Sequence, residues 1–551
     1  MRISTAMEDT PKFESLPLSR RSLLSAGAAL GLSAAVPGCS NAGRGGTSGS
    51  NDSAAKAKVR PAYVRYDGVK ADLPGARYGI PDGFLRYPAD PVQAITEPPG
   101  DGKPIEVMTS TNTPIPPAVA QNAFWQQFNE RVGSPVQLNL TPSVSYDEKF
   151  ATSVAGGTLG DIFSIGNVPQ KPQMLAAKAV DLTPHLAGDK ITKYPYLANL
   201  PETSWNATIF DGKIYGIPIP RGAISSEVLY ARKDILDDQG LPAELKSADD
   251  FVRLCKALTD KRKNRFALAD LPTGYVRNMF GIPNSWKEAD GKLVSGFEHP
   301  AQEEALALVQ QLWKSGYIHP DAFTSQNQDR KTRFGNGTGP LVQATFSGWP
   351  TYLQTMDQDA EIAIIPPPAH DGSGVGHTWL GAPTLSVTAI SKAAEARVET
   401  MLAYLNYLAA PFGTSEYLFR KYGIKGIDHQ VQDGDPVLTK KGFSETQLAL
   451  QYQADGPWAI FLPERKGSTE SCFNAMKEIC PQAVANPVDG MYSETASRKG
   501  GQLNRDINAV SDDIIQGRAP VSAWGQAVKK WKSAGGDKIA EELYAQYKTS
   551  R

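Results

Sequence analysis

Histidine, cysteine and glycine are the residue types whose spacing could indicate catalysis or metal binding in this chain, and their pattern is sparse. The sequence holds no Walker-type phosphate loop, no His-Glu-x-x-His, no Cys-x-x-Cys pair and no Gly-x-Ser-x-Gly turn. His370 and His377 flank a cluster of glycines, but two histidines alone are a weak pattern for a metal, and we interpret the segment as a flexible turn. We therefore expect no catalytic residue, no metal site and no cofactor.

The cysteines leave two alternatives open. If Cys472 and Cys480 lie in one straight helix, they are about 12 Å apart, which is beyond the reach of a disulfide. If the helix breaks between them, a disulfide could form and stabilise the fold. Cys255 follows the apolar spacing of a predicted helix and is expected to pack as a small core residue.

The start of the chain has the pattern of an export signal. Residues 23–36 form an apolar run too short to span a bilayer, and Arg20 and Arg21 precede it. Residues 19–24 resemble a twin-arginine export motif, with ordinary Sec export as the alternative. Residues 36–39 are similar to a bacterial lipobox and predict a lipid on Cys39, the alternative being a signal without a lipid. We expect a signal peptide over 1–39 and a flexible tether and lead-in over 40–102.

Length and composition exclude several classes of protein. A chain of 551 residues exceeds a single core and predicts two or three domains. The 57 Lys and Arg against 58 Asp and Glu leave a net charge of −1, which excludes the basic surface of a nucleic-acid-binding protein. Four cysteines are too few for a disulfide scaffold, and a charged fraction of 21% with ample aromatics argues against disorder.

Apolar runs alternate with helical repeats along the body of the chain. Short strands are expected at 104–108, 136–140 and 161–165. Helices, marked by apolar residues at i, i+3, i+4 and i+7, are expected over 118–132, 247–260, 301–315 and 391–409. Ser247 is a suitable N-cap, and Gly316 is placed to end a helix. The alternation predicts mostly parallel sheets covered on both faces, in two α/β lobes with a ligand cleft between them.

Several short motifs follow one another in a characteristic order. In chain order they are residues 146–150 with 161–163, residues 180–184, Asp211-Gly212-Lys213-Ile214-Tyr215-Gly216-Ile217-Pro218, residues 229–234, residues 422–426 with 433–434, and residues 524–538. Together they resemble the family 1 extracellular solute-binding proteins of ABC importers, and most of all the lipoprotein branch that includes binders of alginate and other oligosaccharides. The resemblance extends over about residues 100–551.

The resemblance implies a periplasmic-binding-protein-like fold of type II, in which two α/β lobes close on a ligand about a hinge. The expected N-terminal lobe is residues 103–220 plus 366–410, and the expected C-terminal lobe is residues 221–365 plus 411–551. The chain should cross between lobes near 216–229, near 365–383 and after about 410. Some alginate-binding relatives carry a calcium loop after the helix corresponding to 247–260, but the cationic residues 261–265 make calcium unexpected here.

A sugar site combines aromatic platforms with polar side chains, and the chain offers both. We favour Trp349 and Trp379, because they lie near strand ends in the part of the family fold that forms the cleft. Core packing is the alternative for every tryptophan, and a structural ion pair is the alternative for Arg221. Trp313 and Trp531 lie on predicted helices and are expected to pack or to lie at the surface. The expected ligand-binding residues are Trp349, Trp379, Trp205, Trp286, Trp458, Arg221, Ser225, Ser110, Thr111, Asn112 and Asn167.

The resemblance implies an extracytoplasmic binding lipoprotein that captures an oligosaccharide by lobe closure and delivers it to ABC permease subunits. We expect a monomer, held by a lipid on the outer face of the cytoplasmic membrane, without a nucleic-acid partner. One alternative is a secreted carbohydrate-active hydrolase, which needs two cleft carboxylates about 5–9.5 Å apart. Another is the same binding fold for a peptide or other solute.

Overall fold

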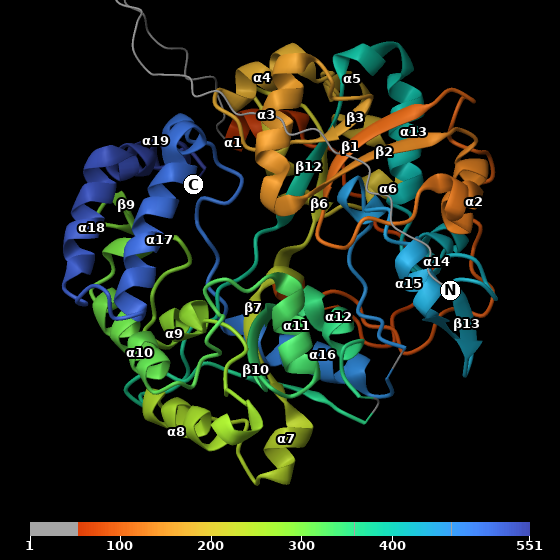
Figure 1. Ribbon diagram of the computed structural model, residues 1–551. Coiled ribbons are helices and arrows are strands. Elements are labelled where there is room, and N and C mark those ends of the chain that lie inside the picture. The colour runs from red at the N-terminus through yellow and green to blue at the C-terminus, as the bar shows by residue number, and fades with distance from the viewer. Residues whose placement is uncertain (1–52, 76, 358, 464, 551) are drawn as a thin grey trace, which may run out of the picture. The chain divides into compact units, whose positions relative to one another are not determined.

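The computed structural model describes residues 53–75, 77–357, 359–463 and 465–550 (Figure 1). The expected export signal and the expected lipidation site at Cys39 lie outside the described residues. Within these described ranges, no helix combines the length and the apolar character that crossing a bilayer requires.

The first of two main sheets has five strands. Its order is β2 (Val136–Pro142), β1 (Ile105–Thr111), β3 (Ile162–Ser164), β12 (Thr384–Ile390) and β6 (Ile217–Pro220). β1 pairs in parallel with β2 and β3, as expected for strands joined by crossover helices. β12 runs antiparallel to both β3 and β6, and its first residue lies opposite the last residue of β6.

The second main sheet has three strands and is antiparallel throughout. Its order is β10 (Leu341–Thr345), β7 (Glu227–Arg232) and β11 (Ile362–Ile365). Three two-stranded ribbons are β4 (Ile209–Phe210) with β5 (Lys213–Ile214), β8 (Trp286–Ala289) with β9 (Lys292–Ser295), and β13 (His429–Gln432) with β14 (Asp435–Leu438). The expectation of mostly parallel sheets is wrong, because β12 returns from the second sheet and enters the first where β6 leaves it.

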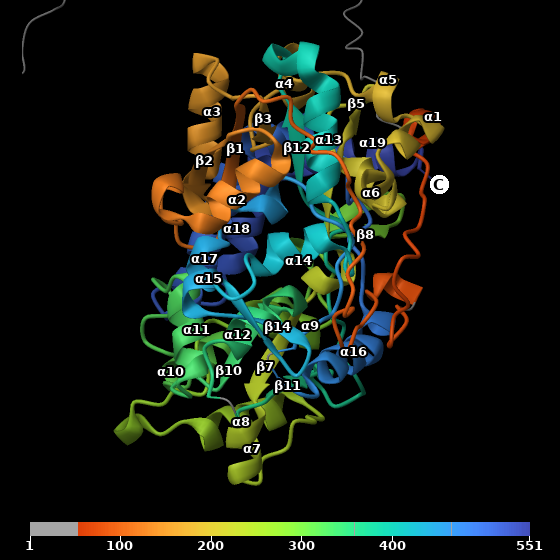
Figure 2. The same cartoon turned by 90° about the vertical axis from the view of Figure 1, so that its right-hand side faces the viewer.

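Helices surround both sheets (Figures 1 and 2). Those packed with the first sheet or beside it are α1 (Ser53–Val59), α2 (Ala123–Val132), α3 (Tyr146–Gly156), α4 (Lys171–Lys178), α5 (Thr183–Leu186), α6 (Pro195–Ala198), α13 (Val398–Leu408), α14 (Ser415–Tyr422) and α15 (Lys440–Glu445). Those packed with the second are α7 (Lys233–Asp238), α8 (Ala248–Leu258), α9 (Thr273–Met279), α10 (Gln302–Lys314), α11 (Asn327–Gly335), α12 (Trp349–Leu353), α16 (Ser468–Ile479), α17 (Gly501–Ile515), α18 (Ala523–Trp531) and α19 (Asp537–Tyr547).

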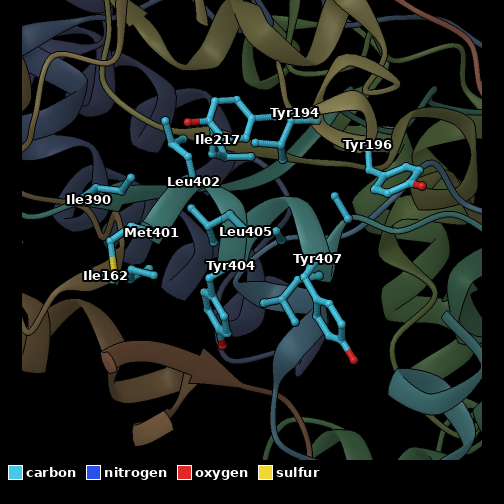
Figure 3. Packing of buried hydrophobic residues seen from close by; sticks show 14 of the residues in the cluster. Ile162, Tyr194, Tyr196, Ile217, Ile390, Met401, Leu402, Tyr404, Leu405 and Tyr407 are labelled. Carbon is cyan, nitrogen blue, oxygen red and sulfur yellow. The ribbon is translucent and has the colours of Figure 1, made fainter. Parts of the chain in front are cut away.

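Helix α13 supplies much of the apolar core beside the first sheet. Figure 3 shows its Met401 and Leu402 directed toward Ile162, Ile217 and Ile390 of three different strands. All five side chains are fully buried. The apolar face of one helix therefore joins strands that are more than 200 residues apart in the sequence.

The expected helix at 247–260 is confirmed as α8. The Ser247 hydroxyl accepts a hydrogen bond from the Asp250 N–H at 3.3 Å, as an N-cap should. The residues of its apolar repeat, Phe251, Leu254, Cys255 and Leu258, are all buried. Cys255 is thus a core residue, as predicted.

Two other expected helices begin later than the apolar pattern indicated. Residues 392–397 form a 3-10 turn before α13, so the predicted helix 391–409 is regular only from Val398. Asn122 caps α2 through a 2.9 Å hydrogen bond from the Trp125 N–H, which excludes residues 118–121 from the helix. Val119 is accordingly 40% exposed and not part of the apolar face. The helix predicted at 301–315 is confirmed as α10, after which Gly316 adopts a φ of +71°.

The chain joins the two main sheets through residues 221–226 and again through residues 366–383. These connections run side by side: the N–H groups of Arg221 and Gly222 donate to the carbonyls of Pro383 and Ala382 at 2.9 Å. Residues 419–454 still contribute to the apolar cluster of the first sheet, whereas residues from 460 join that of the second. The lobe boundaries stay a prediction, and this packing favours a last crossing near residue 455 rather than near 410.

Candidate functional site

A cavity of about 320 Å³ lies among elements of the second half of the chain. Its volume is at the lower end of the range of about 300–1,000 Å³ that small-ligand sites occupy. Four aromatic side chains line it: Trp286 at the start of β8, Phe297 just after β9, Trp379 in the connection 366–383, and Trp531 at the end of α18. Figure 1 shows β9 beside α18 and α19, which bring these segments together.

Hydrogen bonds and ring contacts hold the aromatic walls of this first cavity in place. The indole N–H of Trp379 donates to the carbonyl of Ile282 at 2.8 Å. The ring of Phe297 packs edge-on against Trp531 at 5.4 Å, and Trp286 lies 6.1 Å from the same indole. The rings are thus positioned before any solute arrives, which reduces the entropy that binding must overcome.

The polar side chains of the first cavity are Arg277 on α9, Gln302 at the start of α10 and Asn504 on α17. In the amide orientation that satisfies both groups, the Gln302 oxygen accepts from Nε and Nη2 of Arg277, each at 3.2 Å. Burial lowers the pKa of Arg277 to about 10. Apolar platforms beside hydrogen-bonding groups are the combination that a sugar ring needs.

A second cavity of about 170 Å³ is lined by Trp349 of α12, by Tyr417 and Lys421 of α14, and by Asp455 and Trp458. Asp455 lies among three cations. It is 2.8 Å from Nη1 of Arg420, 3.5 Å from Nη1 of Arg221 and 3.7 Å from Nζ of Lys421.

The charges of this second site perturb one another strongly. Burial alone would raise the pKa of Asp455, but Lys421, Arg420 and Arg221 lower it below its usual value. Burial lowers the pKa of Lys421 to about 8, against the opposing effect of Asp455. The Trp458 ring lies beneath both cations, 5.1 Å from the Arg221 guanidinium carbon and 5.7 Å from the Lys421 nitrogen.

The five tryptophans named from the sequence lie in different surroundings in the structure. Trp286 and Trp379 line the first cavity, and Trp349 and Trp458 line the second. Trp205 lines neither, since it is 1% exposed and packs in the core beside the first sheet. Trp349 is only 2% exposed and packs edge-on against Tyr230 at 5.4 Å. Core packing, the alternative stated for every tryptophan, therefore applies to Trp205 and to most of the Trp349 side chain.

The predicted polar residues do not gather with the tryptophans. The Asn112 amide lies 3.5 Å from the Tyr452 hydroxyl, the Thr111 hydroxyl is 3.0 Å from that of Thr113, and the Asn167 N–H donates to Asp147. Arg221 forms the ion pair that was its structural alternative. The predicted polar residues that line neither cavity are Ser110, Thr111, Asn112, Asn167, Arg221 and Ser225. Their role in binding stays a prediction.

No metal-binding cluster of three or more His, Cys, Asp or Glu side chains occurs in the part of the chain that the structure describes. His370 instead stacks on the Phe280 ring at 4.4 Å. Cys472 and Cys480 are both buried and free, so the disulfide alternative is not realised. α16 runs unbroken from Ser468 to Ile479 and leads directly into a 3-10 turn at Cys480–Gln482, so the two cysteines lie about two helical turns apart.

Sequence reasoning missed Arg277, Phe297 and Trp531 in the first cavity, and Lys421 and Asp455 in the second. Trp531 lies on a helix, as expected, but its ring also lines the first cavity. A usable indication existed for Arg277, which is the single charged residue between Asp270 and Lys287. A single charged residue within a long uncharged segment that becomes buried indicates a specific partner or ligand.

Comparisons with known proteins agree with this architecture. The model of the family described as bacterial extracellular solute-binding protein matches residues 123–441, more than half of the chain. A polygalacturonan/rhamnogalacturonan-binding protein, YtcQ of Bacillus subtilis, is 24% identical over 451 residues, which cover 77% of this chain and 88% of that protein. Lipoprotein LipO of the same organism is 21% identical over 482 residues, covering 82% and 94%.

Among solved structures, the alginate-binding protein AlgQ2 without calcium ion superposes with a TM-score of 0.61. It is 16% identical in sequence, and the match covers 82% of this chain and 99% of that one. The similarity establishes the periplasmic-binding-protein-like fold of type II, with two α/β lobes, that the sequence motifs predicted.

Proposed function

Because the chain belongs to the bacterial extracellular solute-binding protein family, we propose that it captures an oligosaccharide outside the cytoplasm and delivers it to an ABC importer. The observation that carries the choice of a sugar is the first cavity, where Trp286, Trp379 and Trp531 surround a guanidinium and two amides. Aromatic faces pack on the C–H faces of a pyranose, and the polar groups bind its hydroxyls.

Transport would follow from lobe movement rather than from catalysis by this chain. Residues 221–226 and 366–383 join the two main sheets and are hydrogen bonded to each other, so they are suited to act as a hinge. The first cavity lies among elements packed with the second sheet and the connection that carries Trp379. Contacts that the other lobe adds to the same sugar on closing would stabilise the closed conformation, and the permease would recognise that conformation.

The proposal also includes export of the protein and its attachment to the membrane by a lipid. Residues 19–24 and 36–39 would direct twin-arginine export and lipidation of Cys39. The relative LipO is named a lipoprotein, which supports the same arrangement here. The lipid would hold the receptor, as a monomer, on the outer face of the cytoplasmic membrane near its permease.

Thermal unfolding of the purified exported protein with a panel of oligosaccharides tests the proposal. A bound sugar raises the melting temperature in a concentration-dependent manner, because it binds the folded state only. Peptides and cell-wall fragments in the same panel test the alternative solutes. A panel in which only peptides or only cell-wall fragments shift the melting temperature contradicts a carbohydrate ligand.

Release of reducing sugar from the same panel tests the hydrolase alternative. That activity needs two carboxylates about 5–9.5 Å apart around the scissile bond. The linings of the two cavities described above contain one carboxylate, Asp455, and it is already paired with three cations. We expect binding without turnover.

A further inference from the structure

Arg277 brings a positive charge into the first cavity without a matching negative charge. No Asp or Glu is among the residues that line this cavity, and among the described residues Arg277 has no carboxylate within ion-pair distance. Some arginines elsewhere pair with a carboxylate, as Arg232 does with Asp234 at 2.6 Å. Other half-buried arginines donate to backbone carbonyls, as Arg265 does to Leu258 at 2.9 Å and Arg465 does to Leu353 at 2.8 Å. Arg277 differs from both groups in that it lines a cavity and its partner is the amide side chain of Gln302.

The neighbours of Arg277 orient the guanidinium but do not neutralise it. The Gln302 amide oxygen binds Nε and Nη2, and the Phe297 ring centroid lies 6.0 Å from the guanidinium carbon. Glu298, the nearest acid along the chain from Phe297, accepts from the Ser295 N–H and pairs with Lys532. These contacts hold the cation in place and leave its charge for a solute to balance.

A half-buried guanidinium is expensive to keep without an anion. Arginine stays protonated at neutral pH, so it cannot avoid the cost of burial by losing its proton, as a lysine can. Burial is the single cause of the lowered pKa of Arg277, with no carboxylate to oppose it. The first cavity thus places a half-buried cation next to three indole rings.

We propose that the first cavity binds an acidic sugar residue, whose carboxylate pairs with Arg277 while its ring packs against Trp286 and Trp379. This inference rests on the proposed function and names the class of saccharide, an oligosaccharide that contains a uronic acid. A planar carboxylate can accept two parallel hydrogen bonds from a guanidinium, which a neutral hydroxymethyl group cannot. A sugar phosphate offers the same oxyanion chemistry and is the second source that the experiment must separate.

The experiment compares sugars that differ in one group. Uronate disaccharides of gluco, galacto and manno configuration are titrated into the exported protein by calorimetry, each beside its carboxyl-reduced counterpart and the corresponding 6-phosphate. At least one uronate should bind about 10- to 100-fold more tightly than its reduced counterpart, since a hydrogen bond to a charged group contributes about that much to affinity. Tighter binding of a 6-phosphate than of every uronate would overturn the assignment to a carboxylate.

The variant Arg277→Gln tests whether this arginine is the source of the preference for uronate. The variant should bind uronate and reduced sugar with nearly equal affinity, because it retains hydrogen bonding and loses the charge. Its melting temperature without sugar should equal or exceed that of the parent, whereas loss of a structural arginine would lower it. Arg253→Gln on α8 is the matched control, since Arg253 is 69% exposed and distant from the cavity lining. It should keep the preference for uronate.

The outcomes separate the two proposals. Equal affinity of the parent protein for uronates and reduced sugars overturns the acidic-sugar inference and leaves the carbohydrate receptor intact. A preference for uronate that survives Arg277→Gln overturns the assignment to this arginine. Binding of none of the disaccharides in any form overturns both the inference and the proposed carbohydrate ligand.

Discussion

Trp379 and Trp349 were the two tryptophans favoured from the sequence, and their surroundings now assign them different roles. Trp379 is partly exposed and lines the first cavity, with its indole N–H fixed on Ile282. Trp349 is 2% exposed and contributes to the apolar cluster of the second sheet. The same substitution should therefore affect binding at one position and stability at the other.

We expect Trp379→Ala to weaken oligosaccharide binding by about 2 kcal/mol, roughly 30-fold, because it removes a platform from the first cavity. Trp379→Phe, which retains a ring, should lose less. Trp349→Ala should instead lower the free energy of unfolding by about 3–5 kcal/mol through the cavity that it leaves in the core. Calorimetric titration and urea unfolding measure the two quantities. Trp313→Ala, on α10 outside both cavity linings, is the control and should leave affinity unchanged.

The lowered pKa of Lys421 predicts that the free energy of unfolding changes at alkaline pH. Its pKa is about 8 in the folded protein and about 10.5 in the unfolded chain, so the unfolded state binds more protons between those values. Stability contributed by this group therefore rises as pH increases from about 8 to 10.5. Relative to Lys421→Met, the parent protein should gain about 1–2 kcal/mol of unfolding free energy between pH 8 and pH 9.5. Parallel urea unfolding curves at the two pH values measure the difference, and a constant gap between the proteins would contradict it.

At the scale of elements, the paired connections between the sheets depend on a close backbone approach. A Cβ on Gly381 would lie 2.5 Å from the Ser225 carbonyl carbon and 2.6 Å from the Gly222 carbonyl oxygen. The Gly381 N–H also donates to the Ser226 hydroxyl at 2.9 Å. A side chain at this position must separate residues 221–226 from residues 366–383.

Gly381→Ala should therefore lower the unfolding free energy by about 1–3 kcal/mol, as overpacking does. Chemical denaturation measures the loss. Gly156→Ala at the end of α3 is the control, because its added Cβ would meet only the Thr158 hydroxyl at 3.8 Å. Replacing glycine in a helix should leave stability unchanged or raise it by up to about 1 kcal/mol. Equal effects of the two substitutions would argue against a strained connection.

The elements that could be predicted from the sequence are those whose causes are local. α8 was predicted with its cap and its apolar face, because Ser247 and the repeat of Phe251, Leu254, Cys255 and Leu258 lie within one helix. The direction of β12 could not be predicted, because it depends on pairing with β6, which lies more than 150 residues earlier. Strand pairing of this kind has no local pattern.

In the whole molecule, the candidate site likewise combines residues that could be predicted from the sequence with residues that could not. Trp286 and Trp379 could be named from residue type, since both are tryptophans outside the predicted helices, and both line the first cavity. The role of Arg277 could not be predicted from the sequence. It depends on which segments the fold brings together around the cavity, and on the fact that none of the lining residues is a carboxylate. The sequence motifs predicted the fold and the class of protein more completely than the residues that contact a solute.

Solute-dependent closure is the prediction that belongs to the whole molecule. If residues 221–226 and 366–383 act as a hinge, a bound sugar should shift the population toward a more compact conformation. Small-angle X-ray scattering of the exported protein should then show a radius of gyration that decreases on addition of a sugar identified by thermal unfolding. Trp379→Ala should need a higher sugar concentration for the same decrease, because a ligand shifts the equilibrium only by its differential affinity for the two states. An unchanged radius at saturation, with binding confirmed by calorimetry, would mean that the permease recognises the occupied receptor by a feature other than closure.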